Sequence, residues 1–151
     1  MRVKLLEILY EWSKKPYQKI MKTNLPWNIS EAELKHYHKE SLGYHLRQFL
    51  KGNNFQVQAK LENHDIFHIL TNTGTTVHEE ISMQYYLLGN GKRSIYLFTV
   101  IVLGTTLFPD YISLFIKAYK RGKAAHPFYP LNFLKMLQQP TERIKSTFKI
   151  Q

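Results

Sequence analysis

Residues 64–80 read HDIFHILTNTGTTVHEE, and this stretch gathers four potential metal ligands in a chain with few acidic residues. Its two histidines, His64 and His68, are four residues apart, which places them on one face of an α-helix. Glu80 cannot belong to the same helix, because a continuous helix would carry it about 24 Å away from His64. The turn residues Asn72–Thr76 lie between the two parts. The stretch therefore predicts a helix–turn–helix that folds Glu80 back towards the histidines.

The two adjacent glutamates of the second helix have different expected roles. Thr76 followed three residues later by Glu79 is a capping box, in which the Glu79 side chain reaches back to the N-cap backbone. Glu80 shares a helix face with the apolar residues Ile81 and Leu88, so we expect it to face the interior. Glu79 should point the opposite way.

These residues predict a metal site. Asp65 lies near the helix face of the two histidines, which makes His64, Asp65, His68 and Glu80 four candidate ligands and candidate catalytic residues. Two imidazoles and a carboxylate among apolar neighbours cost several kcal/mol unless they are paired or bound to a metal. Mixed nitrogen and oxygen ligands suit a divalent metal such as zinc, with iron, cobalt or manganese as alternatives.

The remaining sequence predicts an all-α fold, because helical periodicity dominates and no strand alternation competes with it. At 151 residues the chain is long enough for one domain with a substantial core. We expect a single bundle (1–151) of six to seven helices, with a basic N-terminal segment (1–30) and a core (31–151). Beside the two motif helices, the expected helices lie near residues 2–13, Ser30–Gly52, Ser94–Phe108, Asp110–Gly122 and 131–149, the last bent or broken at Pro140.

The most apolar run, Ser94–Phe108, has two interpretations. It can be a buried core helix, or it can be a wall of an apolar tunnel or groove for an isoprenoid tail, where Gly104 lets a chain approach the backbone. It is shorter than the roughly 20 apolar residues that span a bilayer, so we do not expect it to cross a membrane.

The charge distribution favours a membrane surface as a partner. The net charge is +10, and basic residues cluster in 1–24 and again at Lys117, Lys120, Arg121 and Lys123. Near aromatic and apolar helices, such clusters fit docking on anionic lipid. No nucleic-acid-binding motif is present, so we expect no nucleic-acid partner. The absence of cysteine excludes a disulfide scaffold and a thiolate metal site. The first ten residues lack the apolar core of a signal peptide, and if the protein is bacterial we expect it in the cytoplasm, associated with the inner face of the cell membrane.

The motif resembles the signature of the ubiquinone (coenzyme Q) biosynthesis Coq-four family, and the similarity covers roughly residues 35 to 150. Elements similar to those of the family are Ser41-Leu42-Gly43, the run from His64 to Glu80 with Ile69-Leu70 and Gly74-Thr75 inside it, Arg121-Gly122-Lys123-Ala124, and Gln139-Pro140 with Lys145, Phe148 and Ile150. The chain departs from the family at Leu137-Gln138, where the family usually has a tryptophan followed by an acid, and over the first thirty residues.

The resemblance implies a helical, membrane-associated protein that binds polyprenylated aromatic precursors of ubiquinone. The implied reaction is the oxidative removal of the ring carboxyl group at C1, with His64, Asp65, His68 and Glu80 binding the metal beside the lipid head group. Other quinone-biosynthesis enzymes are implied partners, and a homo-oligomer is an open alternative.

Two other functions remain open from the residues alone. In an HD-type phosphohydrolase, His36 or His38, the His64-Asp65 pair and Asp110 would surround a metal, but this scheme leaves His68 and Glu80 without a role. A non-catalytic isoprenoid-lipid-binding assembly factor with a structural metal is the second alternative. The other histidines, His36, His38, His45 and His78, are expected to face solvent, and His126 lies in a linker.

Overall fold

The computed structural model describes Lys4 and residues 26–57 and 62–151. The expected helix near residues 2–13 and nearly all of the basic N-terminal segment lie outside these ranges. The described residues form an all-α bundle without a β-strand, which confirms the predicted fold class. In order, the elements are α2 (Glu31–Leu34), α3 (Leu42–Gly52), α4 (Glu62–Thr71), α5 (Val77–Gly89), α6 (Ile95–Leu107), the 3₁₀ turn η1 (Pro109–Tyr111), α7 (Ile112–Ala124), the 3₁₀ turn η2 (Phe133–Met136) and α8 (Thr141–Phe148).

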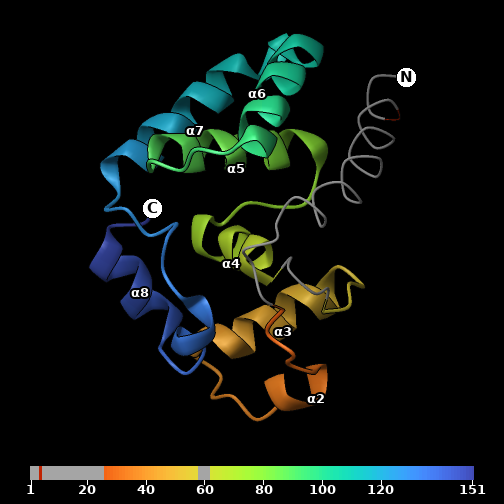
Figure 1. Cartoon of the computed structure of the whole chain (residues 1–151), viewed down its shortest axis with the longest axis vertical. Coiled ribbons are helices and arrows are strands. Elements are labelled where there is room, and N and C mark those ends of the chain that lie inside the picture. Colours follow the sequence, from red (N-terminus) through yellow and green to blue (C-terminus); the bar gives the residue numbers. More distant parts are fainter. Residues whose placement is uncertain (1–3, 5–25, 58–61) are drawn as a thin grey trace.

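The helices form two groups with α4 between them (Figure 1). Helices α5, α6 and α7 pack together at one end, and α2, α3 and α8 lie at the other. Helix α4 contacts both α3 and α5, so the core is continuous through it. Its buried Phe67 meets Phe128 and Phe133 edge to face, with ring centroids 6.3 and 5.7 Å away.

Helices α5 and α7 approach so closely that only glycine fits at their crossing. A Cβ atom on Gly122 would lie 1.9 Å from the carbonyl oxygen of Tyr86, and one on Gly89 would lie 2.1 Å from that of Tyr119. Because Glu80 is on α5, this crossing also fixes the helix that carries one side of the predicted site.

The buried side chain of Asn90 ties the end of α5 to the chain that follows α7. Its amide nitrogen donates to the carbonyl oxygens of Gly122 and His126, at 3.3 and 3.0 Å. Its amide oxygen accepts from the backbone N–H groups of Phe128 and Tyr129, at 2.9 and 3.3 Å. Both polar ends of the buried amide are therefore satisfied.

The prediction of one helix over Ser30–Gly52 is wrong, because two helices form there. The Ser30–Glu33 capping box is present, but α2 ends at Leu34. Ser41 is extended, its hydroxyl donates to the carbonyl of His38 at 2.6 Å and accepts from the N–H of Tyr44 at 3.2 Å, and so it starts α3 as a new N-cap. Its extended backbone pairs with Pro140 in an isolated bridge.

The C-terminal region is also less helical than the expected 131–149 helix. Only η2 and α8 form there, and α8 starts directly after Pro140, as expected from a proline break. At the other junction, Pro109 separates α6 from the following helix and the two are bent by 104°.

Of the two interpretations of Ser94–Phe108, the buried core helix is wrong. Helix α6 buries only Leu97 and Gly104, while Ile95 is 80% exposed and Val102 62% exposed. It packs against α5 along one side, where Gly104 faces Ile81, and leaves an apolar side outward. Among the described residues no single helix is long and apolar enough to cross a membrane, and only the bent pair Ile95–Leu107 and Pro109–Ala124 passes that test together.

Candidate metal centre

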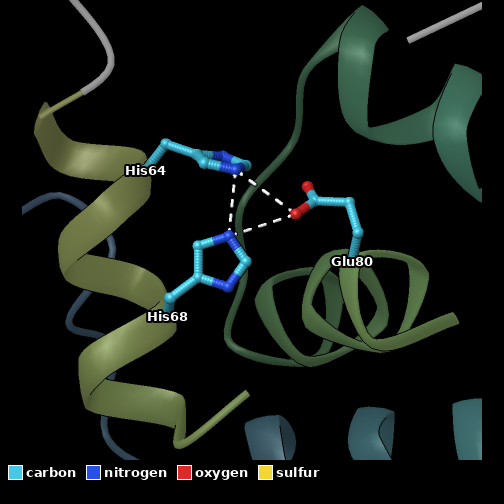
Figure 2. Close-up of side chains that lie close together, drawn as sticks. All are labelled: His64, His68 and Glu80. Carbon is cyan, nitrogen blue, oxygen red and sulfur yellow. Dashed lines mark hydrogen bonds and ion pairs between the residues drawn. The ribbon is translucent and has the colours of Figure 1, made fainter. Parts of the chain in front are cut away.

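The structure brings His64, His68 and Glu80 together across the turn between α4 and α5 (Figure 2). The two histidines are one helical turn apart on α4, and Glu80 is in the first turn of α5. Glu79 closes the capping box as expected, since its Oε2 atom accepts from the N–H of Thr76 at 3.1 Å and from its hydroxyl at 2.5 Å. The cap directs Glu79 to the turn and leaves Glu80 facing α4.

The three donor atoms form a nearly equilateral triangle. The Nε2 atoms of His64 and His68 are 3.2 Å apart, and they lie 3.3 and 3.2 Å from Oε2 of Glu80. Ligands at zinc-bond lengths on the corners of a tetrahedron are roughly 3.3 Å apart. The three donors therefore fit three corners of a tetrahedral metal site, and the fourth corner is left for a ligand from outside the group, as in catalytic zinc sites.

Neighbouring groups fix the orientation of two of the three donors. Nδ1 of His68 lies 3.3 Å from the carbonyl oxygen of Thr73, which can only accept a hydrogen bond, so Nδ1 carries a proton and Nε2, which faces Glu80, is the atom that would bind a metal after losing its own proton. The ring of Phe49 stacks on His68 at a centroid distance of 5.2 Å. The side chain of Gln84 donates to the second oxygen of Glu80 at 3.0 Å.

The electrostatics show a coupled acid and base pair in a buried setting. Burial raises the pKa of Glu80, but the charge of His64 and hydrogen bonds from both histidines outweigh it and hold the pKa well below its usual range. Burial lowers the pKa of His64, but the charge and hydrogen bond of Glu80 outweigh it and the net shift is upward. A divalent cation would replace the proton that these groups share, so the donor set fits a metal.

Asp65 is not part of this group. The donor atoms of the other three residues all lie within 4.8 Å of one another, whereas no carboxylate oxygen of Asp65 belongs to that set. Burial raises the pKa of Asp65 to about 6, against the opposing charges of His64 and His68. The structure therefore assembles three of the four predicted ligands and leaves Asp65 outside that group as a half-buried acid.

The residues that an HD-type phosphohydrolase would require do not form such a group in the described part of the chain. His36 and His38 are exposed between α2 and α3, and Asp110 lies in η1. Of the other histidines, His126 is exposed as expected of a linker. His45 and His78 differ from expectation, as both are half-buried: Nδ1 of His45 lies 2.7 Å from the hydroxyl of Thr141, and the His78 ring stacks on Tyr111 at 4.7 Å.

A cavity of about 490 Å³ adjoins His68 on the side of α3 and α8. Phe49 and Ile69 supply apolar walls, and His45, Thr141 and Lys145 supply polar ones. The sequence did not indicate this cavity, because its walls come from helices far apart in the chain. Nor did it indicate Lys92, whose charge acts on both His64 and Glu80.

No family model matches the chain, and no curated protein is similar to it in sequence. A solved structure that it does resemble is a crystal structure at 2.85 Å resolution of a Nostoc punctiforme protein, whose provisional name is that of a ubiquinone biosynthesis protein. The match has a TM-score of 0.70 and 15% sequence identity, and it covers 83% of this chain and 70% of that chain. At this identity the comparison establishes a shared fold.

Proposed function

We propose that this chain is a ubiquinone biosynthesis protein of the Coq-four type, which binds polyprenylated aromatic quinone precursors and removes the ring carboxyl group at C1. The observation that carries the proposal is the donor triangle of His64, His68 and Glu80, built from the residues of the motif HDxxH…E. The shared fold with the Nostoc punctiforme protein, and the provisional name of that protein, support the same role.

In the proposed reaction, His64, His68 and Glu80 hold a divalent metal, with zinc as the first choice and iron, cobalt or manganese as alternatives. When bound, the metal supplies a Lewis acid that polarises a carboxylate or phenolate of the ring. Asp65, with its pKa raised to about 6, is suited to hold or release a proton near neutral pH. His68 is buried and the side chain of Glu80 is 14% exposed, so both donors act on the bound group in a partly desolvated setting.

The reaction balances if water supplies the new ring oxygen. The bond between C1 and the carboxyl carbon breaks, carbon dioxide leaves and C1 gains a hydroxyl group. Two electrons and two protons pass to a two-electron oxidant of the quinone class.

The test is turnover of a prenylated carboxy-aromatic substrate by the purified protein, supplied with metal and a quinone oxidant, together with mass spectrometry of the metal and lipids that co-purify. Release of carbon dioxide that is lost in Glu80→Gln and kept in Glu79→Gln supports the proposal. Binding of the prenylated lipid without any turnover assigns the chain to the non-catalytic assembly factors. A protein that takes up no divalent metal contradicts both.

We further propose that the protein lies at the inner face of the membrane and docks there through α6, η1 and α7. The supporting observation is a set of exposed apolar side chains on these elements, Ile95, Phe98, Val102, Tyr111, Ile112, Leu114 and Ile116. Exposed Lys117, Lys120 and Lys123 follow on α7, so the apolar surface is bordered by positive charge. An interfacial helix with basic neighbours binds anionic lipid through both features.

Vesicle sedimentation tests the docking surface. We expect binding to vesicles rich in phosphatidylglycerol that weakens at least tenfold in Val102→Asp and is unchanged in Ser146→Asp, an exposed position on α8. Equal vesicle binding by the two variants would contradict docking on lipid through this surface. A stable dimer that dissociates in Val102→Asp would show instead that a second copy of the chain covers it.

A further inference from the structure

Lys92 occupies a position in which an apolar residue is usual. It follows α5 in a Schellman motif: Gly91 has φ +107°, its N–H donates to the carbonyl of Leu88 at 3.1 Å, and the N–H of Lys92 donates to that of Leu87 at 2.9 Å. The residue at this place in the motif commonly packs back on the helix as a hydrophobic contact. Here the motif turns a lysine side chain back towards the core.

The ammonium group of Lys92 lies over α4, the helix that carries both histidines, at a residue three positions after His64. Its Nζ atom is 4.7 Å from the ring centroid of Phe67, which is next to His68 on α4. Its charge acts on Glu80 and on His64. The side chain is half-buried, and the Phe67 ring is the contact recorded for its ammonium, with no ion pair or hydrogen bond to it among the described residues.

Burial and charge make this arrangement costly unless a ligand compensates for it. Burial lowers the pKa of Lys92 to about 8, partly offset by the charge of Glu80, so the side chain remains charged at neutral pH. A metal held by Glu80 would also repel the ammonium. An anion bound between the Lys92 ammonium and the metal would remove both the cost of burying the ammonium and its repulsion by the metal. It would neutralise the ammonium and occupy the fourth corner of the tetrahedron that the three donors begin.

We propose that Lys92 binds the carboxylate of the ligand at the metal centre and so orients the ring that carries it. This inference rests on the proposed function for the identity of the ligand, but the anion site itself can be tested separately. The competing role is structural, in which Lys92 only balances the charge of Glu80 and keeps it in place.

The two roles differ in their effect on metal binding. If Lys92 positions Glu80, then Lys92→Met weakens metal binding. If Lys92 binds a ligand anion, the same variant binds metal as tightly as the parent protein or more tightly, because a repelling charge is gone. Methionine retains the length and most of the apolar stem of lysine, so the Schellman motif and the contact with Phe67 should survive.

The experiment uses the full chain loaded with cobalt and benzoate as the carboxylate probe, with the cobalt absorption spectrum as the readout. We expect Lys92→Met to weaken benzoate binding about tenfold or more, Lys92→Arg to retain most of it, and the exposed Lys135→Met to leave it unchanged. The affinity for cobalt should be equal or higher in Lys92→Met.

Unchanged benzoate binding in Lys92→Met overturns the inference, and so does a parent protein that binds cobalt but no benzoate. A weaker affinity for cobalt in Lys92→Met favours the structural role and also overturns it. If benzoate binding depends on Lys92 but prenylated carboxy-aromatic substrates are neither bound nor turned over, then the anion site stands and the proposed function fails.

Discussion

Glu79 and Glu80 are adjacent in the chain, yet their carboxylates serve opposite sides of α5. Glu79 accepts two hydrogen bonds from Thr76 at the turn, whereas Oε2 of Glu80 lies 3.2 Å from His68 and 3.3 Å from His64. Replacing each glutamate in turn by glutamine therefore separates the effect of the helix cap on stability from the effect of the metal site on metal binding.

Glu80→Gln should abolish metal binding, because an amide oxygen is a poor zinc ligand beside two imidazoles. Glu79→Gln should retain metal affinity within a few-fold and reduce the free energy of unfolding by about 1 kcal/mol through the weakened cap. Chelator-competition titration measures the first quantity and urea unfolding the second. Equal losses of metal affinity in both variants would contradict the division of roles.

The motif region could be predicted from the sequence because its signals are local. The spacing of His64 and His68 and the capping box at Thr76 depend only on helix geometry, and both are observed. The role of Asp65 could not be predicted in this way. Its helical phase is close to that of the histidines, but whether a carboxylate reaches their Nε2 atoms depends on rotamers and on packing against other helices.

Asp65→Asn tests whether the metal site has three protein ligands or four. Because Asp65 is outside the donor triangle, the variant should keep its metal affinity within about tenfold, while His68→Ala should lose at least a hundredfold. Zinc titration against a chelator measures both. A loss in Asp65→Asn as large as that in His68→Ala would restore the four-ligand set.

Because α5 and α7 cross so closely, the stability of the fold should depend strongly on Gly122. Alanine there would place Cβ against the carbonyl oxygen of Tyr86, so the helices must separate, and we expect Gly122→Ala to lower the free energy of unfolding by about 3 kcal/mol or more. Gly52→Ala is the control, because nothing lies within 4 Å of its added Cβ, and it should be neutral or slightly stabilising. Similar unfolding curves for the two variants would contradict the close crossing.

Contacts between distant segments account for what the sequence did not predict. At the break between α2 and α3, Ser41 pairs with Pro140, which is about a hundred residues away in the sequence. The exposure of α6 depends on how much of a uniformly apolar helix its neighbours cover, which periodicity cannot indicate. For Lys92, the sequence Asn90-Gly91-Lys92 marks a helix end, but the site towards which the side chain turns is set by α4.

The pH dependence of stability tests the burial of Lys92 without any ligand. Its pKa is about 8 in the folded protein and near 10.5 when the chain is unfolded, so the unfolded state binds more protons between these values and stability rises with pH across that window. At pH 7 the ammonium is charged and its burial is unfavourable. In metal-free protein, Lys92→Met should therefore be more stable than the parent at pH 7, by on the order of 1–3 kcal/mol.

The stability advantage of Lys92→Met should shrink from pH 8 to pH 10.5, while the control Lys135→Met should show no such trend. Urea unfolding at pH 7, 8.5 and 10 measures it. A variant that is less stable than the parent at every pH would mean that the ammonium stabilises the fold through Phe67 and Glu80.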